Sequence, residues 1–186
     1  MTTIFRQWDK EISALGSASS VIQSSRSAHS IHGLVSSEFL TRQKDFSEKE
    51  ITYSIGDCRQ KGIVDEDSFR IALMNLVDNA CKYAKPGTRI SIQFSTIGTW
   101  LHVSVEMTSL YVSPDEYYLI GQAGHRGREA LKIVEQGQGI GMGRVVKFFD
   151  DAGCEFQSIW GPISSQSGGL RWASNSFVVK IPLQDS

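Results

Sequence analysis

Two consecutive segments that alternate apolar and polar residues constrain the fold most strongly. Residues 89–95 read RISIQFS and residues 100–107 read WLHVSVEM, so every second side chain in each segment is apolar. The intervening TIGT is a turn sequence. Two such segments joined by a short turn predict a β-hairpin that presents one face to a hydrophobic core.

Helical patterns lie on both sides of this hairpin. The acidic stretch at 65–68 offers capping groups for a helix that begins near Ser68 and runs to about Ala84, where Pro86 prevents continuation. A second helix is expected in RVVKFFDDAG, ended by Gly153. SPDEYYLI, residues 113–120, has the serine and proline of a short helix start. Further strands are expected at 50–55, 62–64, 154–160 and 176–182.

This order of elements predicts the fold class. Helices alternate with strands that are paired by hairpins, which favours an α/β fold in two layers over an alternating doubly wound fold. We therefore expect a two-layer α/β sandwich, with a mixed β-sheet and helices packed on one face. GPISSQSGGLRWASN, residues 161–175, is expected to be a long turn between strands.

The N-terminal part is expected to be distinct from this sandwich. Apolar residues at helical spacing predict a helix within residues 4–22, and its pairing with a second copy would give a homodimer. The serine-rich residues 24–37 either extend that helix or form a linker. We accordingly divide the chain into an N-terminal helical segment or linker, residues 1–47, and a domain at residues 48–186. One interpretation of the N-terminal segment is the remnant of a dimerisation hairpin.

Composition restricts the environment and the partners. The 186 residues carry a formal net charge of −1, which gives no electrostatic reason to expect nucleic acid or an anionic membrane. Three cysteines without metal-ligand spacing fit reduced thiols, and Cys81 is expected to be a small core residue. The sequence has neither a long apolar run nor a signal-peptide pattern, so we expect a cytoplasmic chain without membrane insertion.

Glycines are concentrated just before the second predicted helix. In GQGIGMG, residues 137–143, glycines allow backbone N–H groups to approach an anion, and the following helix directs its positive end at the same place. The stretch therefore indicates a phosphate cradle, with a flexible loop and an ordinary helix start as the alternative. It is not a Walker loop, because no Gly-Lys-Ser/Thr follows.

The first helix carries two amides on one side. Asn75 and Asn79 are four residues apart, so their side chains lie one above the other. An amide oxygen suits Mg²⁺, which joins phosphates with few protein ligands, and Lys82 is placed to reach a phosphate. The alternative is that both amides bond to neighbouring backbone.

Together these elements resemble a known superfamily. NLVDNACKYA, residues 75–84, resembles the N box of the GHKL superfamily, and GQGIGMGRVVKFFDDAG, residues 137–153, resembles its G2 box. The superfamily includes gyrase B, MutL-type repair proteins, heat-shock chaperones and sensor histidine kinases. The spacing of the boxes, the hairpin between them and the final strand SFVVKIPL also match, so the resemblance covers about residues 48–183.

The resemblance implies a Bergerat fold that binds ATP and Mg²⁺ between the helical layer and a mobile lid, here GQAGHRGREALKIVEQ, residues 121–136. It implies that Asn79 is the Mg²⁺ ligand and Asn75 a catalytic positioning residue. His125, Arg126 and Arg128 in the lid could approach the phosphates. The remaining nucleotide-contact residues are expected to be Lys82, Tyr83, Gly137, Gly139, Ile140, Gly141, Met142 and Gly143.

Asn75 separates branches of the superfamily. Hydrolases and anti-sigma kinases usually carry a glutamate at this position, whereas histidine kinases commonly carry asparagine. Because an amide cannot act as a carboxylate base, the sequence looks closest to the catalytic domain of a sensor histidine kinase.

The chain departs from the family at the adenine-side motif DxGxG. The alternating valines place Met107 at the aspartate, and Ser109 and Tyr111 at the two glycines. Methionine cannot replace the charge-assisted contact with the adenine amino group, which puts ATP and Mg²⁺ binding in question. Glu106 could substitute only through a one-residue slip, which would turn its side chain to the other face of the strand.

Three hypotheses follow. The first is a catalytic domain that transfers the γ-phosphoryl group of ATP to a histidine on a partner helix. The second is a degenerate domain, a pseudokinase, that binds a kinase or response regulator as an interaction module. The third is an anti-sigma type switch, against which Asn75 counts. His29 and His32 lack the acidic and basic neighbours of the family's phosphoacceptor, so that histidine is expected to lie elsewhere or to be absent.

Overall fold

A computed structural model describes residues 25–122, 124–133 and 139–184 of the chain. The helix predicted within residues 4–22 lies outside these described residues. The helical elements are α2 (Ile31–Thr41), α3 (Gln43–Glu48), α4 (Glu66–Tyr83), the 3₁₀ turn η1 (Pro114–Glu116), α5 (Arg128–Leu131) and α6 (Gly141–Asp151). The strands are β1 (Ser27–Ser30), β2 (Thr52–Ile55), β3 (Lys61–Val64), β4 (Arg89–Ile97), β5 (Trp100–Leu110), β6 (Glu155–Ile159), β7 (Ile163–Ser167) and β8 (Leu170–Pro182).

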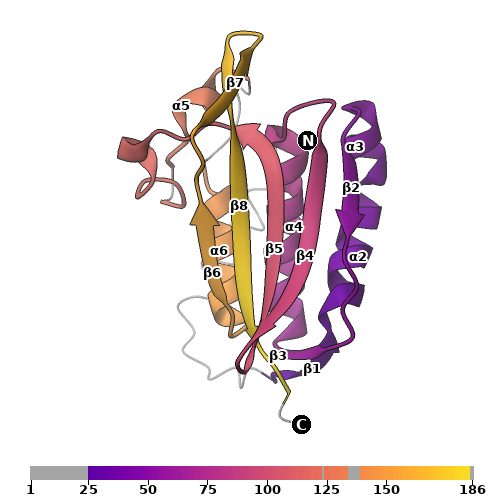
Figure 1. Cartoon of the computed structure of the whole chain (residues 1–186). Coiled ribbons are helices and arrows are strands. Elements are labelled where there is room, and N and C mark those ends of the chain that lie inside the picture. The colour runs from indigo at the N-terminus through magenta and orange to yellow at the C-terminus, as the bar shows by residue number, and fades with distance from the viewer. Residues whose placement is uncertain (1–24, 123, 134–138, 185–186) are drawn as a thin grey trace, which may run out of the picture.

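Six of these strands form one mixed sheet (Figure 1). Its order is β2-β4-β5-β8-β6, with β7 also paired to β8. The β2–β4 pair is parallel and the other pairs are antiparallel. A separate two-stranded antiparallel sheet joins β1 to β3.

The predicted hairpin is confirmed as β4 and β5. The two strands pair antiparallel with Phe94 opposite Val103. Alternate residues of β5, among them Leu101, Val103 and Val105, are buried, because this face of the sheet is turned toward the helices. The two-layer α/β sandwich with a mixed sheet is therefore the observed architecture.

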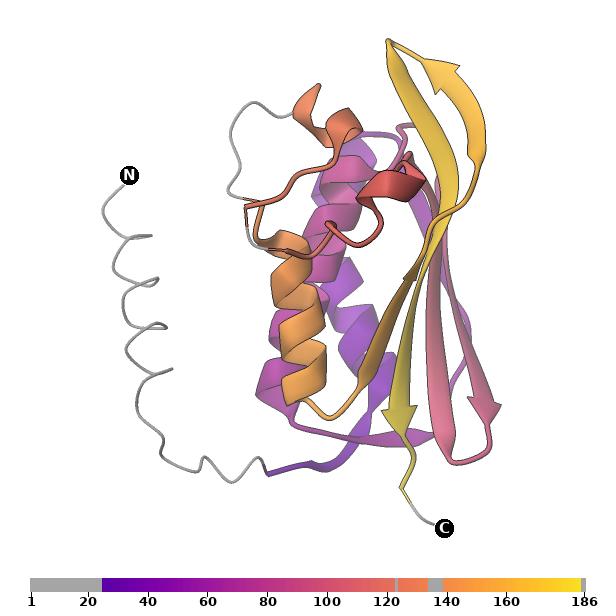
Figure 2. The same ribbon diagram turned by 90° about the vertical axis from the view of Figure 1, so that its left-hand side faces the viewer.

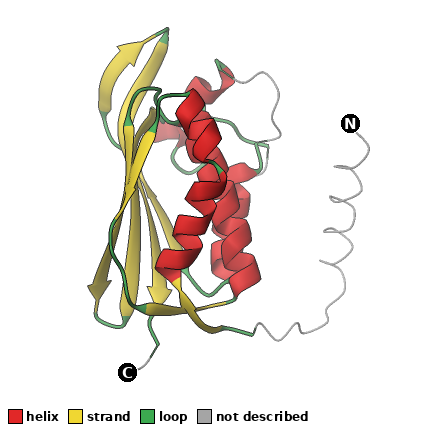
Figure 3. Cartoon of the chain, turned by 90° about the vertical axis from the view of Figure 1, so that its right-hand side faces the viewer, coloured by secondary structure: helices red, strands yellow, loops and turns green. Residues whose placement is uncertain are grey.

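Helices α2, α4 and α6 cover one face of the sheet, as the edge-on views show (Figures 2 and 3). Helix α4 begins after Asp65, whose carboxylate accepts a hydrogen bond from the Ser68 N–H at 3.0 Å. Phe69 of α4 meets Phe149 of α6 edge to face, with ring centroids 5.4 Å apart. The buried side of α4 consists of Phe69, Ala72, Leu73, Leu76, Val77, Ala80 and Cys81.

The residues before position 48 contribute to this same core. The serine-rich stretch contains β1 and the start of α2, in place of an extended helix or a linker. Ile31, Phe39 and Phe46 are almost completely buried and belong to one cluster with the sheet and α4. Because side chains from both sides of residue 48 share one core, the packing gives no boundary at that position.

The prediction of a long turn at residues 161–175 was wrong. These residues contain β7 and the first part of β8, which extend beyond the rest of the sheet as a hairpin (Figure 1). Gly168 and Gly169 have φ angles of 58° and 76°, as a tight two-residue hairpin turn requires. The arm of β7 is mostly exposed, so its sequence lacks the alternation that burial on one face imposes.

Candidate functional site

A cavity of about 270 Å³ lies beside α4 and the N-terminus of α6. Four parts of the chain line it: α4, the end of β5 with the residues that follow, the described part of the lid, and the segment that opens α6. Several predicted site residues meet there. They are Asn75, Asn79, Lys82, Tyr83, Gly139, Ile140, Gly141 and Met142.

The two amides of α4 have different surroundings. The Asn75 amide nitrogen donates to the Ile71 carbonyl at 2.7 Å, so this group bonds to its own helix, as the alternative interpretation expects. The Asn79 amide lies against the start of α6, since a Cβ atom built on Gly141 would be 3.0 Å from its Oδ1. Asn79 is therefore the amide that contacts the glycine-rich segment.

Close packing explains the glycines at this point. Gly139 has a φ of 65°, and a Cβ atom on it would lie 2.7 Å from the His125 carbonyl oxygen. A Cβ atom on Gly143 would lie 2.6 Å from the Gly121 carbonyl oxygen, so Gly143 packs against the lid and does not line the cavity. Gly137 lies outside the described residues.

Lys82 and Tyr83 both line the cavity near the end of α4. The Lys82 ammonium donates to the Asp78 carboxylate at 2.5 Å and is half exposed. Any contact of Lys82 with a phosphate would thus exchange one anionic partner for another. Cys81, on the core side, is buried as predicted, and desolvation raises the pKa of its thiol to about 11, so it is no ready nucleophile.

The end of β5 forms the wall where the family motif is changed. Met107 and Ser109 are buried and line the cavity, and Tyr111 also lines it. Asn175 of β8 supports this wall, because its amide nitrogen donates to Ser109 Oγ at 2.8 Å and to the Leu110 carbonyl at 3.0 Å. Sequence reasoning missed Asn175, since these two partners are more than 60 positions away.

The described part of the lid brings polar side chains to the cavity. His125 lines the cavity, and its Nε2 is buried with no hydrogen-bond partner among the described residues. Arg126 also lines it and donates to the Ala130 carbonyl at 3.1 Å. Arg128, the third predicted lid cation, is instead directed away and pairs with Asp115.

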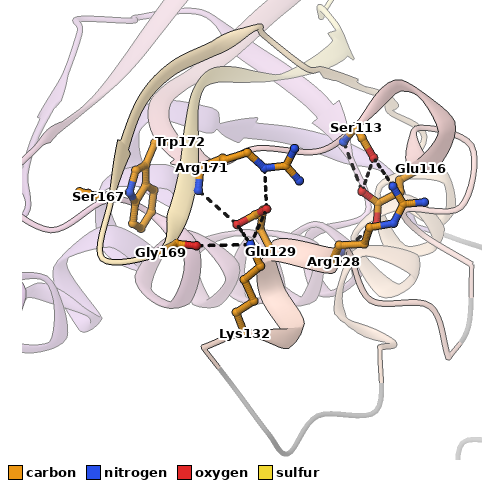
Figure 4. A network of polar contacts seen from close by, with 9 residues as sticks. All are labelled: Ser113, Glu116, Arg128, Glu129, Lys132, Ser167, Gly169, Arg171 and Trp172. Atoms are coloured by element: carbon orange, nitrogen blue, oxygen red, sulfur yellow. Dashed lines mark hydrogen bonds and ion pairs between the residues drawn. The ribbon is translucent and has the colours of Figure 1, made fainter.

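Two buried carboxylates hold this lid, and sequence reasoning found neither (Figure 4). Glu116 accepts from the Ser113 hydroxyl at 2.5 Å and from the Arg128 N–H at 2.8 Å. Glu129 accepts from Lys132 and from Arg171. Burial alone would raise the pKa of both carboxyls, but these hydrogen bonds outweigh it, so each pKa lies below its ordinary value.

Comparison with known families identifies the family of the chain. The sequence model of the family described as "Histidine kinase-, DNA gyrase B-, and HSP90-like ATPase" matches residues 64–185, which is most of the chain. The chain belongs to this ATPase family. The sequence matches no curated protein.

Solved structures of this ATPase family share the fold. A mycobacterial sensor histidine kinase, MprB, superposes with a TM-score of 0.69 at 15% identity, over 86% of this chain and 100% of that one. Full-length ShkA, solved in complex with AMPPNP, gives 0.66 at 22% identity over 94% of this chain and 34% of its own. The nucleotide-free catalytic domain of the histidine kinase ThkA gives 0.64 at 16% identity, over 84% and 95% of the two chains.

The cavity of this family member suits a phosphate-bearing ligand and Mg²⁺. Among the described residues His125 Nε2 has no hydrogen-bond partner and offers a polar contact, and the backbone at Gly139 and Gly141 borders the cavity without a side chain over it. Asn79 supplies a neutral oxygen donor at the same place. In the described part of the chain no three His, Cys, Asp or Glu side chains form a metal cluster, so a metal here would take most of its ligands from the nucleotide and water.

The two histidines near the N-terminal end of the described chain have local contacts. His29 Nδ1 lies 3.0 Å from Glu66, and the His32 ring packs on Phe94 with centroids 5.8 Å apart.

Across residues 25–122, 124–133 and 139–184, the helices are all too short or too polar for a membrane span.

Proposed function

We propose that this chain is the ATP-binding catalytic domain of a sensor histidine kinase or a close relative. It binds Mg²⁺-ATP in the cavity beside α4 and acts in two-component signalling, presenting the γ-phosphate to a histidine on a partner helix. A response regulator is the alternative partner. A homodimer through residues 4–22 stays part of this proposal.

One observation carries the proposal. The Asn79 amide, the backbone at Gly139 and Gly141, and the buried His125 Nε2 meet in one cavity at the N-terminus of α6. A helix N-terminus favours anions, and a neutral amide oxygen favours Mg²⁺. These groups come from three separate parts of the sequence.

The chemistry assigned to the domain is positioning. Mg²⁺, held by Asn79, would neutralise charge on the phosphates. The start of α6 and His125 would fix the orientation of the triphosphate relative to the acceptor. Asn75, whose amide bonds to its own helix, would shape the wall of the cavity and would not act as a base.

A second function is favoured by one specific observation. Met107 occupies the buried position where the family resemblance expects an aspartate that accepts from adenine. A domain that lost nucleotide binding in this way would serve as an interaction module for a kinase or response regulator. The two functions differ in whether ATP binds at all.

Calorimetry with ATP and ADP, with and without Mg²⁺, separates them. We expect binding by the intact chain that strengthens with Mg²⁺, and loss of that strengthening in Asn79→Ala. Gln93→Ala is the matched control, because this amide is exposed on β4, away from the cavity. Absence of binding at millimolar nucleotide by a folded chain would overturn the catalytic proposal in favour of the interaction module.

A further inference from the structure

The described lid contains a buried ion-pair network that ties it to the protruding β7–β8 hairpin (Figure 4). We propose that Glu129 is a positioning residue for nucleotide binding. By holding α5 on β8, it keeps His125 and Arg126 on the phosphate side of the cavity before any ligand arrives. This inference rests on the proposed function, because it concerns the same cavity.

Glu129 is fully engaged although it is a charged residue with only 1% exposure. Its Oε1 accepts from Arg171 Nε at 2.7 Å, and its Oε2 accepts from the Arg171 N–H at 3.1 Å. Lys132 Nζ lies 2.9 Å from both oxygens and 3.3 Å from the Gly169 carbonyl oxygen. A carboxylate is buried at such a site only when it is paired and hydrogen-bonded, so Glu129 is the acceptor that joins α5 to Arg171 of β8.

The residue of α5 that follows Glu129 borders the cavity. Ala130, the next residue, lines the cavity, and its carbonyl accepts from Arg126 Nη2 at 3.1 Å. A Cβ atom built on Gly139 would lie 2.7 Å from the His125 carbonyl oxygen, so this histidine packs against the segment that opens α6. Moving α5 away from β8 would therefore displace His125 and Arg126 from the cavity.

The anchor on β8 is itself fixed. The Arg171 guanidinium lies over the Tyr111 ring at 5.0 Å, and the Tyr111 N–H donates to the Arg171 carbonyl at 2.9 Å. Arg171 thus belongs to the rigid sheet, and Glu129 transmits that rigidity to the lid.

Glu116 provides a second, independent attachment. It accepts from the Arg128 N–H at 2.8 Å and is buried next to Ser113. Because Arg128 is the first residue of α5, loss of Glu129 would free the later part of this helix from β8 while its start stays attached. The consequence of the change is local, and it can be measured in a folded protein.

The experiment compares wild type, Glu129→Gln and Glu155→Gln for binding of ADP and of adenosine by calorimetry. Glu155→Gln is the matched control, because this glutamate pairs with Lys180 on the surface of β6 and β8. We expect Glu129→Gln to weaken ADP binding about tenfold, because apparent affinity falls in proportion to the fraction of molecules whose lid is in the binding-competent position, here about a tenth. Adenosine, which lacks phosphates, should bind within about twofold of wild type, and Glu155→Gln should change neither ligand.

Hydrogen exchange without ligand gives the second readout. Amides of residues 125–131 should exchange faster in Glu129→Gln than in wild type, while those of α4 should not. If Glu129→Gln fails to fold, Arg171→Lys is the second variant, because it keeps the positive charge but loses the planar guanidinium. It should weaken ADP binding less than Glu129→Gln does, and again leave adenosine binding nearly unchanged. Equal loss of ADP and adenosine binding, or unchanged ADP binding and exchange, would overturn the role of Glu129. No ADP binding by wild type would instead overturn the proposed function.

Discussion

The side-chain amide of Asn79 lies directly against Gly141, the first residue of α6. A Cβ atom at Gly141 would be 3.0 Å from Asn79 Oδ1 and 3.5 Å from Nδ2, so the two elements meet without space for a methyl group. Helix α4 and the opening of α6 are thereby fixed relative to each other at the place where a phosphate and Mg²⁺ are proposed to bind.

Gly141→Ala should weaken ATP binding without lowering the stability of the protein. Alanine is a better helix former than glycine by up to about 1 kcal/mol, so α6 should not be weakened. The added methyl group would push the Asn79 amide aside, and we expect ATP affinity to fall by about tenfold or more, equivalent to ~1.4 kcal/mol. Calorimetry and thermal unfolding measure the two effects, with Gly33→Ala on α2 as the control glycine. Unchanged ATP affinity would contradict a phosphate site at this contact.

Met107→Asp tests the adenine side of the cavity. An aspartate here could accept a hydrogen bond from the adenine amino group, and a charge-assisted bond contributes about 1.5–3 kcal/mol. We expect tighter ATP binding, no gain for GTP, and a lower melting temperature because Met107 is buried. Met74→Asp, at an exposed position of α4, is the control. A gain that is equal for ATP and GTP would mean that the base does not lie at Met107.

Local patterns predicted the elements that form the core. The alternation of β4 and β5 and the capped, one-sided helix α4 follow from burial on one face, and burial leaves a periodic signal in the sequence. The exposed strand β7 leaves no such signal, which is why residues 161–175 looked like a turn. Ile31 and Phe39 were not recognised as core because the serines around them obscure any period.

In the candidate site, too, residues in local motifs could be predicted and residues joined by long-range contacts could not. Asn79 and Gly141, which both line the cavity, could be predicted as site residues because each lies in a compact motif with its own chemistry. Glu129 was not found, because its partner Arg171 is 42 positions away and only the fold brings them together. Asn175 was missed for the same reason. Long-range polar networks are built by topology, and a single sequence carries no record of them.

Asn175→Ala should destabilise the protein without touching the cavity surface. The side chain is 1% exposed and bonds to Ser109, to the Leu110 carbonyl and to the Gly161 N–H. Its removal leaves buried backbone groups unsatisfied, and we expect a loss of about 2–3 kcal/mol in the free energy of unfolding. Urea unfolding measures this, with the exposed Gln157→Ala on β6 as control. A loss below about 0.5 kcal/mol, typical of surface substitutions, would show that the network is dispensable.

Stability should fall in acid partly because of Glu129. Burial tends to raise the pKa of this carboxyl, but hydrogen bonds from Lys132 and Arg171 outweigh it and hold the pKa below its ordinary value. A carboxyl with a lowered folded-state pKa stabilises the protein above its unfolded pKa, about 4.3 for glutamate, and the contribution is lost as the pH falls through the folded value. Wild type should therefore exceed Glu129→Gln in free energy of unfolding at pH 7, and the difference should shrink from about pH 4.3 downward.

Urea unfolding of both proteins between pH 7 and pH 3 measures this difference. Glu116 titrates in the same direction but is present in both proteins, so its contribution cancels. Glu155→Gln, where the carboxylate is 60% exposed, should show a small difference that barely changes with pH. If the difference between wild type and Glu129→Gln were constant across the range, the carboxylate would not be held in its charged form by Lys132 and Arg171.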